Sequence, residues 1–141
     1  MKFINSEIEK ERLKKAQLKL FEDDIENFFL MLKNDKLRGA YLFLFDSLER
    51  LIDLWSIENK RVKPENRKER EEIVFKFFPP TFFSKFKSFY IERRAGLYED
   101  VVFIERKDLR SLHKFLMKVI KDLKIKIRPD LMEKLKSIFN R

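Results

Sequence analysis

Hydrophobic residues recur every three or four positions along most of the chain, with charged residues between them. This spacing places the apolar side chains on one face of an α-helix and predicts a series of amphipathic helices. The predicted ranges are residues 6–33, 36–58, 64–77, 81–94, 105–124 and 129–140. No segment alternates long enough to indicate a sheet, and the best strand candidate, Val101–Ile104, has no obvious partner. We therefore predict one all-α domain of five to six helices over residues 1–141.

Polar residues and glycine mark several of the predicted helix ends. Ser6, followed by Glu9, has the form of a capping box at the start of the first helix. Asn34-Asp35 interrupts the apolar pattern, and so short a connection predicts that the first two helices pack antiparallel as the core hairpin. Gly96 is predicted to end the fourth helix, as a left-handed cap or as a turn.

Composition excludes several classes of enzyme and of metal protein. The 141 residues include no cysteine, so there is no disulfide, no Cys-ligated metal and no cysteine nucleophile. The chain has two glycines, too few for a glycine-rich nucleotide-binding loop. The one histidine, His113, cannot form a His-rich metal site. We therefore predict neither a metal nor a cofactor.

Positive charge accumulates towards the carboxyl end of the chain. Lys and Arg number 33 against 24 Asp and Glu, a formal net charge of +9. Residues 103–141 hold twelve of these cations and five carboxylates. Lys114, Lys118 and Lys121 share one face of the predicted fifth helix and could follow a nucleic acid backbone. The alternative is a solvated helix face.

The longest apolar runs, Phe28–Leu32 and Tyr41–Phe45, are five residues each. Neither is long enough to cross a membrane, and the amino-terminal residues show no apolar signal core. We expect a cytoplasmic protein that is not inserted in a membrane.

Seven of the sixteen phenylalanines fall between Phe75 and Phe89. Their helical spacing predicts core packing rather than an aromatic platform for single-stranded RNA. The surplus is also large enough to leave some rings for a dimer face.

Three stretches follow one another in a distinctive order. GAYLFLFDSLERLIDLW is followed by NKRVKPENRKE and then by FYIERRAGLYED, which leads into a Lys-rich helix. This order resembles the HEPN superfamily over about residues 6–125. The resemblance implies a small helical bundle that pairs as a homodimer and is often the toxin-like partner of a minimal nucleotidyltransferase. Many members are metal-independent ribonucleases.

The signature of the family is an arginine, four to six residues and then a histidine, and it falls here on Arg93 and Tyr98. The resemblance therefore implies that Arg93 contacts a scissile phosphate, with Tyr98 in place of the usual base. A tyrosine has a pKa of about 10, which makes it a poor base at neutral pH and argues against nuclease activity. Arg106 and His113 satisfy the same spacing and form an alternative pair.

Arg93 and Arg94 could instead form ion pairs with Glu92, Glu99 or Asp100 at a helix end. Three functions therefore remain open. The first is a HEPN-type dimer that binds or acts on RNA or nucleotides, in which Arg94 also contacts phosphate. The second is a non-catalytic helical module that holds a partner protein. The third is a stand-alone basic protein that binds nucleic acid.

Overall fold

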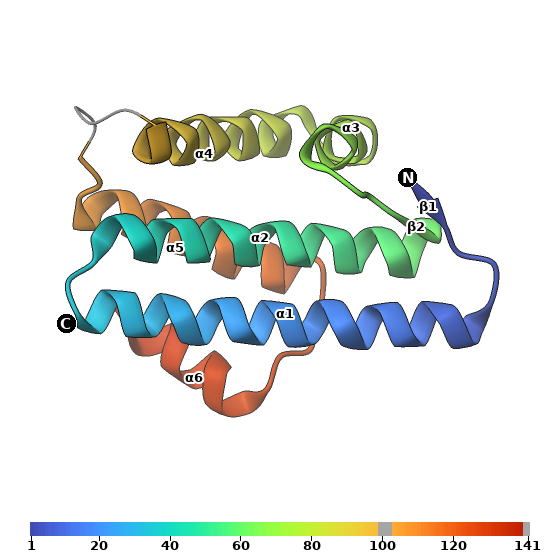
Figure 1. The fold of residues 1–141 in the computed structure, drawn as a ribbon, viewed down its shortest axis with the longest axis horizontal. Coiled ribbons are helices and arrows are strands. Elements are labelled where there is room, and N and C mark those ends of the chain that lie inside the picture. Colours follow the sequence, from blue (N-terminus) through green and yellow to red (C-terminus); the bar gives the residue numbers. More distant parts are fainter. Residues whose placement is uncertain (99–102, 140–141) are drawn as a thin grey trace.

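The first two helices form an antiparallel hairpin along the length of the molecule (Figure 1). The computed structural model describes residues 1–98 and 103–139. Helix α1 spans Glu7–Lys33 and α2 spans Leu37–Lys60. The Ser6 hydroxyl accepts a hydrogen bond from the Glu9 amide at 3.1 Å, which confirms Ser6 as the cap, the first half of the predicted capping box. Asp35 has a φ of 56° and turns the chain between the helices.

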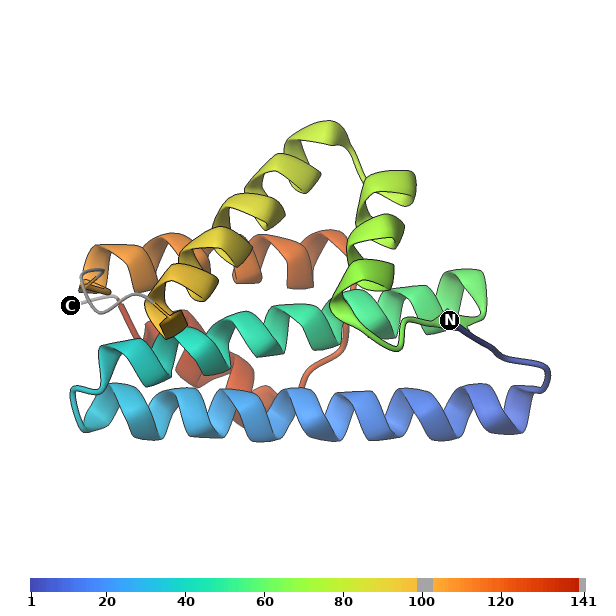
Figure 2. The same ribbon diagram turned by 45° about the horizontal axis from the view of Figure 1, so that its top comes forward.

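Helix α2 is the centre of the bundle, because the other layers of helices pack on it. Figure 1 shows α3 and α4 in one layer, α2 with α5 in the next, and α1 with α6 beyond. Figure 2 shows that α3 and α4 meet at an angle over α2. The four remaining helices are α3 (Arg67–Phe77), α4 (Pro80–Tyr98), α5 (Arg106–Asp122) and α6 (Pro129–Ser137). The prediction of an all-α bundle is therefore confirmed as a class of fold.

Two details differ from the prediction. A two-residue antiparallel ladder joins β1 (Lys2–Phe3) to β2 (Val62–Lys63), although no sheet was expected. Burial of Ile4, whose amide donates to the Arg61 carbonyl at 2.9 Å, holds the amino-terminal segment there. Two residues are too few to show an alternating pattern. Of the strand candidate at 101–104, residues 101–102 lie outside the described residues, and Phe103 and Ile104 are not in a strand.

The second difference is at Gly96, which does not end α4. The helix continues through Gly96 to Tyr98. A glycine ends a helix by adopting a positive φ, and no glycine in the described part of the chain does so. Glycine inside a helix costs about 1 kcal/mol relative to alanine, a cost that the packing of a long helix can offset. Arg93 and Arg94 therefore lie within a helix and not at its end.

Five of the seven clustered phenylalanines pack in or against the core, in the direction predicted, but only Phe86 is fully buried. Phe86 is buried against Phe45 of α2, with ring centroids 5.7 Å apart. Phe82 and Phe89 pack on Phe115 of α5 at 5.0 and 5.3 Å. Phe75, in contrast, is 71% exposed. No helix of the described chain is both long enough and apolar enough to span a membrane.

Candidate functional site

Helix α2 carries a row of carboxylates towards α3 and α4. Asp46, Glu49 and Asp53 are three and four residues apart, so they lie on one helical face. Arginines from the two neighbouring helices face this row: Arg67 and Arg70 from α3, and Arg93 from α4. The sequence pattern did not single out any of these carboxylates.

Arg70 is the innermost of the three arginines and is saturated by protein carboxylates. Its Nε and Nη2 atoms donate to the two oxygens of Asp53 at 2.8 and 2.9 Å, and Nη1 donates to Glu49 Oε2 at 2.8 Å. Burial raises the pKa of the Asp53 carboxyl, and the Arg70 guanidinium opposes this change. Arg70 therefore stabilises α3 on α2 and is not available to a ligand.

Arg67 lies one turn away and is more open. Its Nη2 and Nε atoms donate to the two oxygens of Glu49 at 3.1 and 3.2 Å. The side chain nevertheless remains 44% exposed. Glu49 thus fixes one edge of the guanidinium and leaves part of it facing outwards.

Arg93 points from α4 towards α2 and is 12% exposed. Its Nη2 atom lies 3.3 Å from Asp46 Oδ1, and its guanidinium carbon lies 5.9 Å from the centre of the Phe45 ring. Burial raises the pKa of the Asp46 carboxyl, while Arg93 lowers it. The Nε–H group of Arg93 is buried and has no hydrogen-bond acceptor among the described residues. The sequence analysis had suggested Glu92, Glu99 or Asp100 as ion-pair partners. The partner observed for Arg93 is Asp46, and Glu99 and Asp100 lie outside the described residues.

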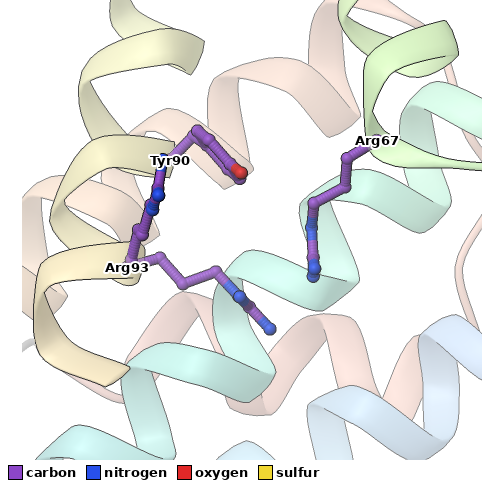
Figure 3. Close-up of a pocket in the computed structure, with 4 residues that line it drawn as sticks. Arg67, Tyr90 and Arg93 are labelled. Carbon is purple, nitrogen blue, oxygen red and sulfur yellow. The ribbon is translucent and has the colours of Figure 1, made fainter. Parts of the chain in front are cut away.

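Four side chains line a hollow of about 470 Å³, which we call the arginine pocket: Arg67, Tyr90, Arg93 and Arg94. Figure 3 shows Arg67 on one side of the pocket, with Tyr90 and Arg93 pointing towards it from α4. Arg94 is exposed, and no carboxylate in the described part of the chain pairs with it. The pocket therefore offers guanidinium donors and one phenol to an anion.

The other predicted site residues lie elsewhere. Tyr98 is the last residue of α4, and its side chain is outside the described part of the molecule. Arg106 Nη2 contacts Asp35 Oδ1 at 3.1 Å. His113 Nε2 lies 2.7 Å from the Leu135 carbonyl oxygen of α6, and burial lowers the pKa of its imidazole. The structure thus engages Arg106 and His113 with separate elements and does not bring them together.

Lys114, Lys118 and Lys121 are exposed on α5, as is Arg110 one turn earlier. The apolar side chains of α5, including Leu112 and Leu116, are buried on its opposite face. We call the four cations the basic face of α5. None of them forms an ion pair within residues 1–98 and 103–139.

Of the four residues that line the arginine pocket, the sequence analysis named Arg93 and Arg94 and did not name Arg67 or Tyr90. No local sequence pattern could link these two residues, because Arg67 lies in α3 and Tyr90 lies in α4 and only the packing of the helices brings them together. Among the described residues, no three His, Asp or Glu side chains gather closely enough to hold a metal ion. Comparison of the chain with protein-family models, with curated proteins and with solved structures found no match.

Proposed function

We propose that this protein binds RNA and that the arginine pocket receives one of its phosphate groups. The observation that carries the proposal is the convergence of Arg67, Arg93 and Arg94 with Tyr90 around one open hollow. Guanidinium groups present planar, parallel N–H donors that match the oxygens of a phosphate. A tyrosine beside them offers a ring for a base and a hydroxyl for a hydrogen bond.

The three arginines of the pocket differ in exposure and in how far protein carboxylates already occupy their N–H groups. Arg94 is exposed and has no carboxylate partner in the described chain, so it can pair fully with a phosphate. Arg93 is ion-paired through Nη2, but its Nε–H group lacks an acceptor among those residues. Arg67 is held by Glu49 and remains half-exposed. We therefore assign the main phosphate contact to Arg94, with Arg93 and Arg67 in support.

The basic face of α5 supports binding of a longer polyanion. Its cations lie three or four residues apart from Arg110 to Lys121, a length of about 16 Å along the helix axis. Cations that have no carboxylate partner in the protein contribute more binding free energy with a polyanion than ion-paired cations do. Each phosphate that they neutralise releases a counterion. The apolar side of α5 is buried in the core, so this helix has no face to insert into a lipid surface.

In this proposal the protein is a HEPN-like homodimer and the toxin-like partner of a minimal nucleotidyltransferase. Binding is favoured over cleavage, because the described lining of the pocket holds no histidine and His113 packs against α6. A ribonuclease that uses the attacking 2′-hydroxyl needs a group that takes up a proton near neutral pH. Tyr98 would have to replace that group, and a tyrosine titrates too high for the task.

Titration with AMP, with adenosine and with a short oligouridylate tests the pocket. AMP should bind and adenosine should not, and Arg94→Ala should weaken AMP at least tenfold by calorimetry. Lys85→Ala, the loss of an exposed and unpaired cation elsewhere on α4, is the matched control. Equal effects of the two substitutions would contradict the assignment of the pocket.

Cleavage is tested separately, with labelled RNA in the presence of EDTA. The wild type should be inert or nearly so. Tyr98→His restores the family spacing and should raise cleavage if the pocket is otherwise competent. Arg93→Ala on that background should then abolish it.

The second candidate function is a non-catalytic module that holds a partner protein. The ion pair between Arg93 and Asp46 favours it, because it gives this arginine a structural role without any ligand. Under this alternative, neither AMP nor RNA binds. A nucleotidyltransferase encoded beside this chain should then form a stable complex with it, measurable by light scattering.

A further inference from the structure

Asp46 differs from the other two carboxylates of its row in how it meets the arginines. Both oxygens of Asp53 accept hydrogen bonds from Arg70. Both oxygens of Glu49 accept hydrogen bonds from Arg67, and one of them also accepts from Arg70. Asp46 Oδ1, in contrast, is buried and accepts no hydrogen bond from the described residues. The arginines therefore hold Asp46 less firmly than its two neighbours in the row.

The cations nearest to Asp46 are two arginines of the pocket. Asp46 Oδ1 lies 3.3 Å from Arg93 Nη2 and 3.6 Å from Arg67 Nη2, and neither contact is a hydrogen bond. The Nε–H group of Arg93 is also buried and has no acceptor in the described chain. Asp46 and Arg93 thus offset each other's charge and leave each other's hydrogen-bonding groups unsatisfied.

A phosphate in the arginine pocket would compete with Asp46 for these guanidinium groups. Both competitors are anions with oxygen acceptors, and the positive charge that Asp46 already offsets attracts a phosphate less. Two anions that share the same arginines also repel each other, and the repulsion is stronger at a partly buried site than in water. Protonation of Asp46 removes both effects, because a carboxylic acid is neutral.

Charged groups of α1, α2, α3 and α4 surround the Asp46 carboxyl. They comprise three arginines that favour its ionised form and two acidic residues that oppose it: Arg50, Arg67, Arg93, Glu49 and Asp24. Burial outweighs the arginines and raises the pKa of the Asp46 carboxyl. A phosphate bound beside it would add a negative charge and raise this pKa further.

We propose that Asp46 is a built-in competitor of the phosphate, and that the pocket takes up a proton when it binds one. In the free protein, the Asp46 carboxylate offsets the charge of Arg93 and Arg67. On binding, a proton from the solvent passes to Asp46, and the charge of the two arginines becomes available to the phosphate. By linkage, the pocket binds phosphate more tightly as the pH falls. This inference rests on the proposed function, because it concerns the regulation of the same pocket.

A uridine tetranucleotide without terminal phosphates is the probe, because its phosphodiesters keep their charge between about pH 5 and about pH 8. By calorimetry at about pH 8, Asp46→Asn should bind it at least about fivefold more tightly than the wild type does. The affinity of the wild type should rise as the pH falls, and the variant should lose most of this rise. Titrations in buffers with different ionisation enthalpies should show proton uptake in the wild type and not in the variant.

Two control variants separate Asp46 from the charges around it. Glu71→Gln removes a carboxylate one turn along α3 from Arg67 that pairs with Lys87, with Lys87 Nζ 2.6 Å from Glu71 Oε1. It should change the affinity less than Asp46→Asn does and leave proton uptake intact. Asp24→Asn tests the neighbouring carboxyl of α1, whose pKa burial raises to about 6. Proton uptake should persist in this variant, and its loss there but not in Asp46→Asn would assign the proton to Asp24 and overturn the inference.

The remaining outcomes distinguish this inference from the proposed function. If both proteins bind equally well and without proton uptake, the pocket keeps its phosphate and only the role of Asp46 is wrong. Binding that appears only in Asp46→Asn would support the inference, and Arg94→Ala on that background should then remove it. If neither protein binds at any pH, the proposed function is wrong and the inference falls with it. Circular dichroism of each variant checks that the helices are intact.

Discussion

Arg93 Nη2 of α4 lies 3.3 Å from Asp46 Oδ1 of α2, so the arginine for which the family resemblance implies a phosphate contact is already ion-paired inside the protein. The pair joins two helices, and its carboxylate is also 3.6 Å from Arg67 Nη2. Asp46 therefore lies within ion-pair distance of two of the arginines that line the pocket, although its Oδ1 atom accepts no hydrogen bond from the described residues.

Replacement of Arg93 by alanine should destabilise the fold. Asp46, whose side chain is 29% exposed, would lose its closest cation and keep Arg67 at 3.6 Å, so we expect a loss of about 1 kcal/mol. Urea unfolding followed by circular dichroism measures the loss. Arg94→Ala should change the free energy of unfolding by less than about 0.5 kcal/mol, because Arg94 is exposed. Equal losses in the two variants would contradict this division of roles.

Arg70→Met should be more damaging than either change. It leaves the buried carboxylates of Asp53 and Glu49 without their shared cation, and breaking a buried ion pair from one side costs about 3–5 kcal/mol. Thermal unfolding should show a large decrease in Tm. Lys68→Met removes an exposed cation of the same helix and is the control. A loss below about 1 kcal/mol would mean that the carboxylates find other partners.

The basic face of α5 should determine how RNA binding depends on salt. Replacing Lys114, Lys118 and Lys121 together by glutamine should weaken binding and reduce the slope of log K against log salt by about 2–3, since fewer counterions are released. Fluorescence anisotropy with oligouridylate at several salt concentrations gives the slope.

Three lysines of α1 provide a control with the same change in net charge. Lys10 and Lys14 pair with Glu58, and Lys19 pairs with Asp23, so they are already neutralised in the protein. Their replacement by glutamine should leave most of the slope intact. If both triple variants lower the slope equally, only net charge matters and the basic face of α5 has no special role.

The pH dependence of stability should carry a contribution from Asp24. Burial raises the pKa of this carboxyl from 3.8 to about 6, although Arg50 lowers it. The folded state therefore holds the proton more tightly than the unfolded state does. This contribution is fully present below about pH 3.8 and is lost as the pH rises through about 6.

Asp24→Asn removes this titration and should gain stability relative to the wild type as the pH rises from about 4 to about 7. The expected gain is at most about 3 kcal/mol, because one pKa unit corresponds to about 1.4 kcal/mol. Urea unfolding at a series of pH values measures it. Asp122→Asn is the control, since Asp122 is exposed on α5 and is not among the groups that act on the Asp24 carboxyl. Parallel pH profiles of the wild type and Asp24→Asn would contradict the assignment.

The sequence by itself determined the helices, because helix formation depends on local spacing. The apolar period of α1 and α2, the Ser6 cap and the break at Asn34-Asp35 all concern residues within a few positions of one another. The exposure of Lys114, Lys118 and Lys121 also followed from the pattern, since the buried apolar residues of α5 leave only one face for charge.

Only the tertiary structure decided which side chains meet. Arg67 and Tyr90 belong to different helices, and the angle between α3 and α4 brings them to one pocket. Asp46, the partner of Arg93, lies on α2 and is far from Arg93 in the sequence. Likewise, β1 pairs with β2 although all of α1 and α2 lies between them in the sequence. Such contacts depend on how helices pack, and the same local pattern is compatible with many packings. For that reason Arg93 and Arg94 could be named from the family resemblance, whereas the packing of α2, α3 and α4 decided which side chains surround them.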